Sequence, residues 1–120
     1  MVDRNNIADV YSLSPLQEGI LFHHITDETS NTYFVQAVIT VNGKVDVDLF
    51  EKTFNKIIER YDILRTVYTY KKTKKPRQVV LKKAEIEFCF KDISGLDEEA
   101  KIEFSHRFKE QDKQKGFDLR

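Results

Sequence analysis

The hydrophobic pattern is clearest between Tyr33 and Val41. In an extended chain, one face of this segment would hold Tyr33, Val35, Ala37, Ile39 and Val41, and the other would hold Phe34, Gln36, Val38 and Thr40. A period of two is typical of a β-strand. Both faces of this segment carry apolar side chains, which indicates a strand that is covered on both sides. Asn42-Gly43 follows and marks a turn. The pattern therefore predicts a central strand over residues 33–41.

Three shorter strands are expected further along the chain. Residues 66–70 and 77–81 are rich in Val, Tyr and Thr, and the basic turn between them predicts a hairpin. In residues 85–91, Ile86, Phe88 and Phe90 would face inward, and the charged residues and Cys89 would face outward.

Helices are predicted over residues 14–24, 46–61 and 97–115. In the first helix, Ser14 can cap the start, Pro15 suits the first helical position and Gln17 completes a capping box. Gly19 is expected to permit close packing of this helix.

The second helix has a clear apolar side and begins at Asp46 or Asp48, and the third ends at Gly116. The resulting order is α-β-α-β-β-β-α. It predicts an α/β fold of the α+β sandwich kind, in which helices pack on a mixed sheet.

The amino-acid composition argues against several classes of protein. The chain of 120 residues has 20 basic and 20 acidic residues, so its net charge gives no overall attraction to nucleic acid or to an anionic membrane. Its one cysteine excludes an internal disulfide framework and suits a reducing cytoplasm. Cys89 lies between two Phe residues without an activating partner, and we interpret it as an inert thiol. No apolar run is long enough for a membrane span.

Two motifs occur in a fixed order. The first is Ser14-Pro15-Leu16-Gln17-Glu18-Gly19-Ile20-Leu21-Phe22-His23, and the second is Arg60-Tyr61-Asp62-Ile63-Leu64-Arg65-Thr66. Together with the tail Phe117-Asp118-Leu119, they resemble the condensation domains of nonribosomal peptide synthetases. The second motif differs from the family pattern at Tyr61, where the family has His. The resemblance spans residues 7–119.

The resemblance implies a chloramphenicol-acetyltransferase-like fold, which has two similar lobes with a tunnel between them. The family's catalytic motif, His-His-x-x-x-Asp-Gly, is absent from this sequence. Residues 14–120 are therefore expected to be the N-terminal portion of a condensation domain that stops before the catalytic loop. Residues 1–13 are expected to form an N-terminal docking or acceptor segment.

The function implied is peptide-bond formation between aminoacyl or peptidyl thioesters held on carrier proteins. The resemblance gives this chain no catalytic residue, and we expect it to be inactive alone. It assigns Arg60 a bridge to the aspartate of the catalytic loop, with Arg65 as a second supporting residue. No cofactor is expected to bind directly, because phosphopantetheine would arrive on the carrier partners.

The alternative function is a non-catalytic docking module that receives the C-terminal tail of an upstream synthetase subunit. Val10, Tyr11 and Leu13 would supply its apolar contacts, and Asp3, Arg4 and Asp9 would select partners by charge. We also expect self-association through the apolar strand over residues 33–41.

Two further features have simpler explanations. His23, His24 and Asp27 are one residue short of the family's catalytic spacing, and we interpret the histidines as helix-end or surface residues rather than catalytic or metal ligands. The basic turn over residues 71–77 is more typical of a solvated hairpin tip than of a nucleic-acid patch, although a nucleic-acid binder remains a third hypothesis.

Overall fold

Three antiparallel strands form the sheet in the computed structural model, which describes residues 3–27, 32–71, 73–117 and 119. They are β1 (Ile7–Ser12), β2 (Thr66–Thr69) and β3 (Arg77–Leu81), in the spatial order β1-β3-β2. The predicted hairpin of β2 and β3 is confirmed. The sequence pattern did not predict β1, which follows the short 3-10 helix η1 (Arg4–Asn6). Both strand pairs are antiparallel, so the mixed sheet that we expected is not observed among the described residues.

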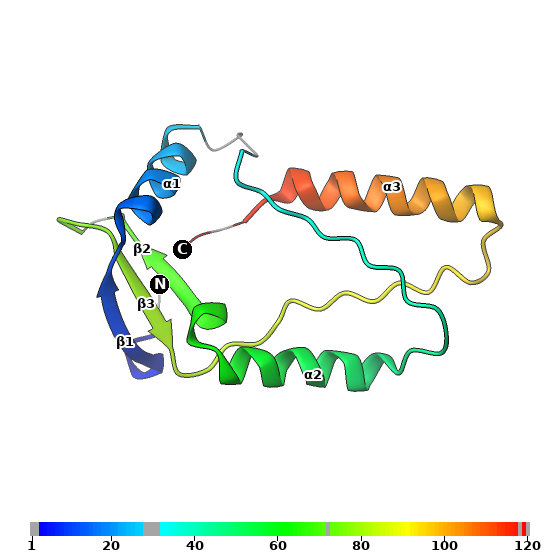
Figure 1. Cartoon of the computed structure of the whole chain (residues 1–120), viewed down its shortest axis with the longest axis horizontal. Coiled ribbons are helices and arrows are strands. Elements are labelled where there is room, and N and C mark those ends of the chain that lie inside the picture. Colours follow the sequence, from blue (N-terminus) through cyan, green and yellow to red (C-terminus); the bar gives the residue numbers. More distant parts are fainter. Residues whose placement is uncertain (1–2, 28–31, 72, 118, 120) are drawn as a thin grey trace.

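The buried core is small and draws its residues mainly from β3 and from two helices, α1 (Pro15–Thr26) and α2 (Val47–Arg60). Its buried apolar residues are Leu13, Leu21, Ile58, Val79 and Val80. Two of these five belong to the central strand β3, which is the strand with neighbours on both sides. Figure 1 shows α1 at one end of the strands and the C-terminal end of α2 at the other.

All three predicted helices are confirmed. Their starting points could be predicted because a capping residue close in sequence determines where each helix begins. The side chains of Ser14, Asp46 and Asp97 each accept a hydrogen bond from the backbone N–H three residues later. The last helix, α3 (Glu98–Lys115), ends at Gly116, whose φ of 61° lies in the left-handed region that favours glycine.

The strands predicted over residues 33–41 and 85–91 are wrong. Both segments are irregular, and within the described residues no backbone hydrogen bond joins either one to a neighbouring strand. Alternation favours an extended chain, but a strand also needs a partner for its backbone groups, and a sequence pattern does not identify that partner.

The two segments nevertheless run between α2 and α3 (Figure 1). Asn55 Oδ1 of α2 accepts a hydrogen bond of 2.9 Å from Ile86 N. On the side of α3, Lys115 Nζ pairs with Glu87 Oε1 at 2.6 Å, and Gln36 Nε2 donates to Asp112 Oδ2 at 3.0 Å. These contacts attach the two irregular segments to α2 and α3.

This arrangement is open. The radius of gyration is 17.5 Å, whereas a compact domain of this length would have about 14 Å. Large apolar side chains consequently remain in contact with solvent, and Val35 and Ile39 are 85% and 82% exposed. Within the described parts of the chain, none of the helices combines the length and the apolar character that crossing a bilayer requires.

Candidate functional site

The first motif forms the start of α1. Ser14 Oγ accepts a hydrogen bond from Gln17 N at 3.2 Å, and Gln17 Oε1 accepts one from Ser14 N at 2.8 Å. These two bonds are the capping box that the sequence predicts. The half-buried Gln17 side chain also meets Gln78 of β3, and its Nε2 donates to Gln78 Oε1 at 3.3 Å. Gln17 therefore both caps the helix and attaches it to the sheet.

The other two residues that we singled out in this motif are exposed. Glu18 lies in the first turn of α1, where a negative charge is favourable. Gly19 has no heavy atom within 4 Å of the position that a side-chain carbon would take. The expected close packing at Gly19 is therefore not observed among the described residues.

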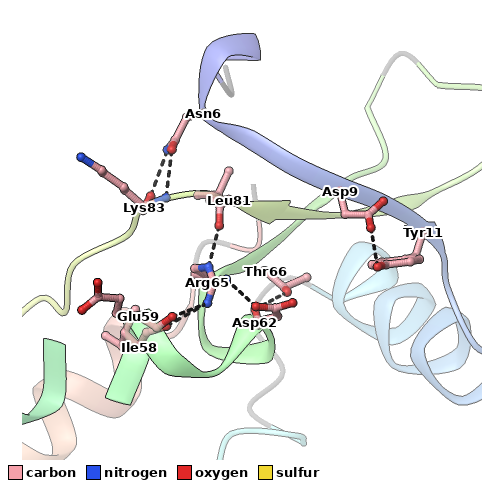
Figure 2. A network of polar contacts seen from close by, with 10 residues as sticks. All are labelled: Asn6, Asp9, Tyr11, Ile58, Glu59, Asp62, Arg65, Thr66, Leu81 and Lys83. Carbon is pink, nitrogen blue, oxygen red and sulfur yellow. Dashed lines mark hydrogen bonds and ion pairs between the residues drawn. The ribbon is translucent and has the colours of Figure 1, made fainter. Parts of the chain in front are cut away.

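The second motif covers the end of α2, the 3-10 helix η2 (Asp62–Arg65) and the start of β2. Figure 2 shows the Arg65 side chain reaching from η2 to α2 and to the end of β3, and also contacting Asp62 within η2. Its Nε donates to Leu81 O at 2.7 Å, at the end of β3. Its Nη1 donates to Ile58 O at 3.2 Å and to Glu59 O at 2.9 Å. Its Nη2 pairs with Asp62 Oδ1.

These four hydrogen bonds make Arg65 a clamp between α2, η2 and β3. Its side chain is only 14% exposed, whereas that of Asp62 is 67% exposed. The planar guanidinium suits this position because it presents several donors in fixed directions to carbonyl oxygens that the end of α2 leaves unpaired. Thr66 Oγ1 adds a bond of 2.8 Å to Asp62 O.

Arg60 is placed differently, although it belongs to the same motif. It is exposed at the end of α2, and its Cζ atom lies 5.6 Å from the centroid of the Tyr61 ring. The ion pairs found among the described residues do not include Arg60. Its guanidinium is therefore open to solvent on the side away from the ring.

A third attachment to the sheet comes from Asn6, which the sequence pattern did not single out. Asn6 Nδ2 donates to Lys83 O at 2.9 Å, and Asn6 Oδ1 accepts from Lys83 N at 3.0 Å (Figure 2). An asparagine amide can donate and accept in this way. The sequence offers no local sign of this role, because the hydrogen-bond partner of Asn6 lies 77 residues away.

On β1, Asp9 and Tyr11 form a polar pair. Tyr11 Oη donates to Asp9 Oδ2 at 2.5 Å, and Val10 N donates to Asp9 Oδ1 at 2.8 Å. The bond from Tyr11, and then the one from Val10, hold the pKa of the Asp9 carboxyl below its usual value of 3.8. The bond to the Asp9 carboxylate and its negative charge in turn raise the pKa of the Tyr11 phenol above 10.0.

The three residues that we predicted for docking are not equally accessible. Val10 and Tyr11 are 48% and 49% exposed on β1, which is an edge strand. Leu13 is only 7% exposed and belongs to the core. A partner could thus contact Val10 and Tyr11 directly, whereas Leu13 offers almost no surface. Because β1 pairs with β3, residues 7–12 are an integral part of the sheet.

The C-terminal tail returns to the sheet at β2, the edge strand opposite β1. Tyr68 N donates a hydrogen bond of 3.1 Å to Leu119 O, which places the tail at the free edge of β2. Phe117 stacks on Phe34 with ring centroids 5.1 Å apart. Asp118 lies outside the described residues. The tail that carries part of the resemblance thus lies beside β2, the strand that begins at the last residue of the second motif.

The histidines of α1 lie near its C-terminal end. The ring centroids of His23 and Tyr33 are 5.7 Å apart, and Asp27 N donates a hydrogen bond of 3.0 Å to His23 O. Among the described residues, no group of three or more His, Cys, Asp or Glu side chains is arranged to hold a metal ion. Cys89 is an exposed free thiol.

Comparison with known proteins identifies relatives for nearly the whole chain. The family model described as "Condensation domain" matches residues 7–120. The chain is 48% identical over 119 residues to a plipastatin synthase subunit of Bacillus subtilis strain 168, and this match covers 99% of the chain. It is 44% identical to gramicidin S synthase 2 of Brevibacillus brevis over 97% of the chain. It is 40% identical to surfactin synthase subunit 2 of Bacillus subtilis strain 168 over 98%.

These relatives are far longer than the chain. It spans 5% of the plipastatin synthase subunit and 3% of each of the other two proteins.

Proposed function

The chain belongs to the condensation-domain family, and we propose that it supplies the first part of an N-terminal lobe in a peptide-bond-forming enzyme. The reaction is acyl transfer between two carrier proteins. The acceptor amine attacks the carbonyl carbon of the donor thioester, the carbon–sulfur bond breaks, and the thiol of the donor carrier leaves. The amine loses a proton, and the acceptor carrier then holds the lengthened peptide.

The observation that supports this proposal most strongly is the set of hydrogen bonds made by the Arg65 side chain. Its four hydrogen bonds fix the second motif against α2 and β3, and a fixed motif is what a support for a catalytic loop requires. The hydrogen bond from Tyr68 N to Leu119 O sets the tail at the adjacent edge of β2. We expect the catalytic loop to lie near this edge of β2, and the residues that support it would then belong to the second motif.

Within this scheme the two arginines have separate roles. The donors of Arg65 are engaged inside the lobe, whereas the exposed guanidinium of Arg60 is available to a carboxylate on the catalytic loop. A bidentate bridge would fix the geometry of that loop as well as its charge. The chain itself provides positioning residues and no catalytic residue, and we expect it to be inactive alone.

The same proposal defines the partners and the finer fold. The lobe would belong to a chloramphenicol-acetyltransferase-like fold, with a carrier protein entering from each side. Phosphopantetheine would be held by those carriers and not by this chain. An upstream synthetase subunit is a further partner. The proposed compartment is the cytoplasm, whose reducing conditions suit a chain with one cysteine.

A second candidate function is docking of an upstream subunit on β1. One observation favours it, which is that Val10 and Tyr11 are about half exposed on an edge strand. An extended or helical tail could pack on these side chains, and Asp3, Arg4 and Asp9 would then select it by charge.

The experiment that tests the main proposal is a domain swap. In the plipastatin synthase subunit that is 48% identical, the stretch that this chain matches is replaced by this chain. The product is followed by mass spectrometry with loaded carriers. We expect the swap protein to form the peptide bond and the isolated chain to form none. A folded swap protein without product would contradict the proposal.

A further inference from the structure

The charges of this chain are strongly segregated, although its net charge is zero. Residues 63–84 contain eight of the 20 basic residues and none of the 20 acidic ones, so the remainder carries 12 basic against 20 acidic residues. The basic stretch contains β2, β3 and the turn between them. A charge distribution of this kind produces a local positive potential on a protein that is neutral overall.

The turn between β2 and β3 concentrates this charge at one end of the sheet. Lys71, Lys74, Lys75 and Arg77 are all exposed, and they are the described cations of the basic turn over residues 71–77. Figure 1 shows the turn projecting from the sheet on the side away from α3. Lys72 lies outside the described residues.

Ion pairs within the described residues do not neutralise the lysines of the basic turn. The four ion pairs found there are made by Lys56, Arg65, Lys101 and Lys115. Lys71 Nζ lies 5.9 Å from the centroid of the Tyr70 ring, and Arg77 Nη1 donates to Ser12 Oγ. In the part of the chain that the structure describes, the three lysine charges are consequently available to a partner.

The base of the turn is rigid. Thr69 pairs with Arg77, and Thr66 pairs with Val80. Val79 and Val80 are each only 4% exposed, which anchors β3 in the core. The ladder and the buried valines therefore fix where the turn leaves and rejoins the sheet, so the basic turn is presented at a defined end of the sheet.

We propose that the basic turn is an electrostatic docking surface for an acidic region of another protein. Nucleic acid fits less well, because the Tyr70 ring is half-buried beneath Lys71 and offers no open stacking platform. The acidic remainder of the chain would also repel a long polyanion. A membrane fits less well because residues 71–78 contain no apolar side chain other than Pro76 to insert among lipids. This proposal does not depend on the peptide-bond-forming role.

The experiment titrates a polyglutamate peptide into the isotopically labelled chain and follows backbone amide NMR signals. We expect shifts confined to the turn and its flanking strand ends, with an affinity that falls as NaCl rises from about 50 to about 300 mM. The triple variant Lys71→Glu, Lys74→Glu, Lys75→Glu should weaken binding about tenfold or more. The matched control Lys44→Glu, Lys52→Glu, Lys113→Glu changes the net charge equally on exposed lysines elsewhere and should retain most of the affinity.

Parallel titrations use a single-stranded DNA oligonucleotide of the same net charge and vesicles containing phosphatidylserine. Tighter binding of either probe than of polyglutamate would overturn the proposal. An equal loss of affinity in the two triple variants would also overturn it, because net charge rather than the basic turn would then be responsible.

Discussion

The Nε–H of Arg65 donates a hydrogen bond of 2.7 Å to the carbonyl oxygen of Leu81, 16 residues further along the chain. This bond joins the end of the second motif to the end of the central strand. The same guanidinium donates to the carbonyl oxygens of Ile58 and Glu59 in the last turn of α2. One side chain thus fixes the relative positions of a helix and a sheet.

Replacing Arg65 with lysine should lower the free energy of unfolding by about 2–4 kcal/mol, because part-buried carbonyl groups would lose their donors. Lysine keeps the charge but cannot present donors in the same fixed directions. The matched control is Arg60→Lys, at an exposed position of the same motif, and it should be near neutral. Urea unfolding followed by circular dichroism measures both variants. Equal effects of the two variants would show that Arg65 is not a clamp.

Gln17→Ala should cost about 1–2 kcal/mol, since it removes both the capping box and the contact with Gln78. Gln17→Glu keeps an acceptor for Ser14 N and should recover part of the loss. Thermal unfolding of the two variants beside Glu18→Ala checks this. The idea fails if Glu18→Ala, at an exposed neighbouring position, is as damaging as Gln17→Ala.

The Asp9–Tyr11 pair should make stability depend on pH in a defined direction. The pKa of Asp9 is lowered on folding, so its contribution is present above the unfolded value of about 3.8 and is lost as the pH falls through the folded value. Tyr11→Phe should move the pKa of Asp9 back toward 3.8, although not fully, because the bond from Val10 N remains. Carboxyl carbon NMR measures this pKa, and Tyr61→Phe is the control. An unchanged pKa in Tyr11→Phe would contradict the assigned cause.

The segment 33–41 should drive self-association. It is uncharged and β-prone, and its large apolar side chains other than Phe34 are exposed. This composition favours intermolecular strand pairing. Ile39→Lys should lower the association measured by sedimentation velocity at several concentrations. Gln111→Lys adds the same charge at an exposed position of α3 and should have little effect. Wild-type protein that stays monomeric throughout would remove this prediction.

Much of the local structure could be predicted from the sequence because its causes are local. Ser14, Asp46 and Asp97 act on backbone groups three residues away, so the helices begin where the pattern indicates. The strands over 33–41 and 85–91 could not be predicted correctly, because pairing depends on a distant partner. Ile86 and Phe88 are half-buried, and Phe88 lies beside Phe50 of α2, so their alternation reports packing against a helix as readily as it reports a ladder. Phe90, which we predicted to face inward, is 58% exposed.

The candidate site shows the same division. The capping role of Gln17 follows from the motif, whereas its contact with Gln78 depends on a residue 61 positions away. Arg65 looks like a solvated arginine at a helix end until Leu81 is brought beside it. Asn6 gave no signal, since nothing local distinguishes it from Asn5.

The central claim is that Arg65 holds the second motif in place and leaves Arg60 free to hold a catalytic loop. The most direct measurement is the rate of peptide-bond formation by the swap protein carrying Arg60→Ala, determined alongside its unfolding transition. Turnover should fall at least about tenfold, since a bridged carboxylate loses its partner, while the lobe held by Arg65 stays folded. Wild-type turnover in Arg60→Ala would make Arg60 an ordinary surface arginine with no role in holding the loop.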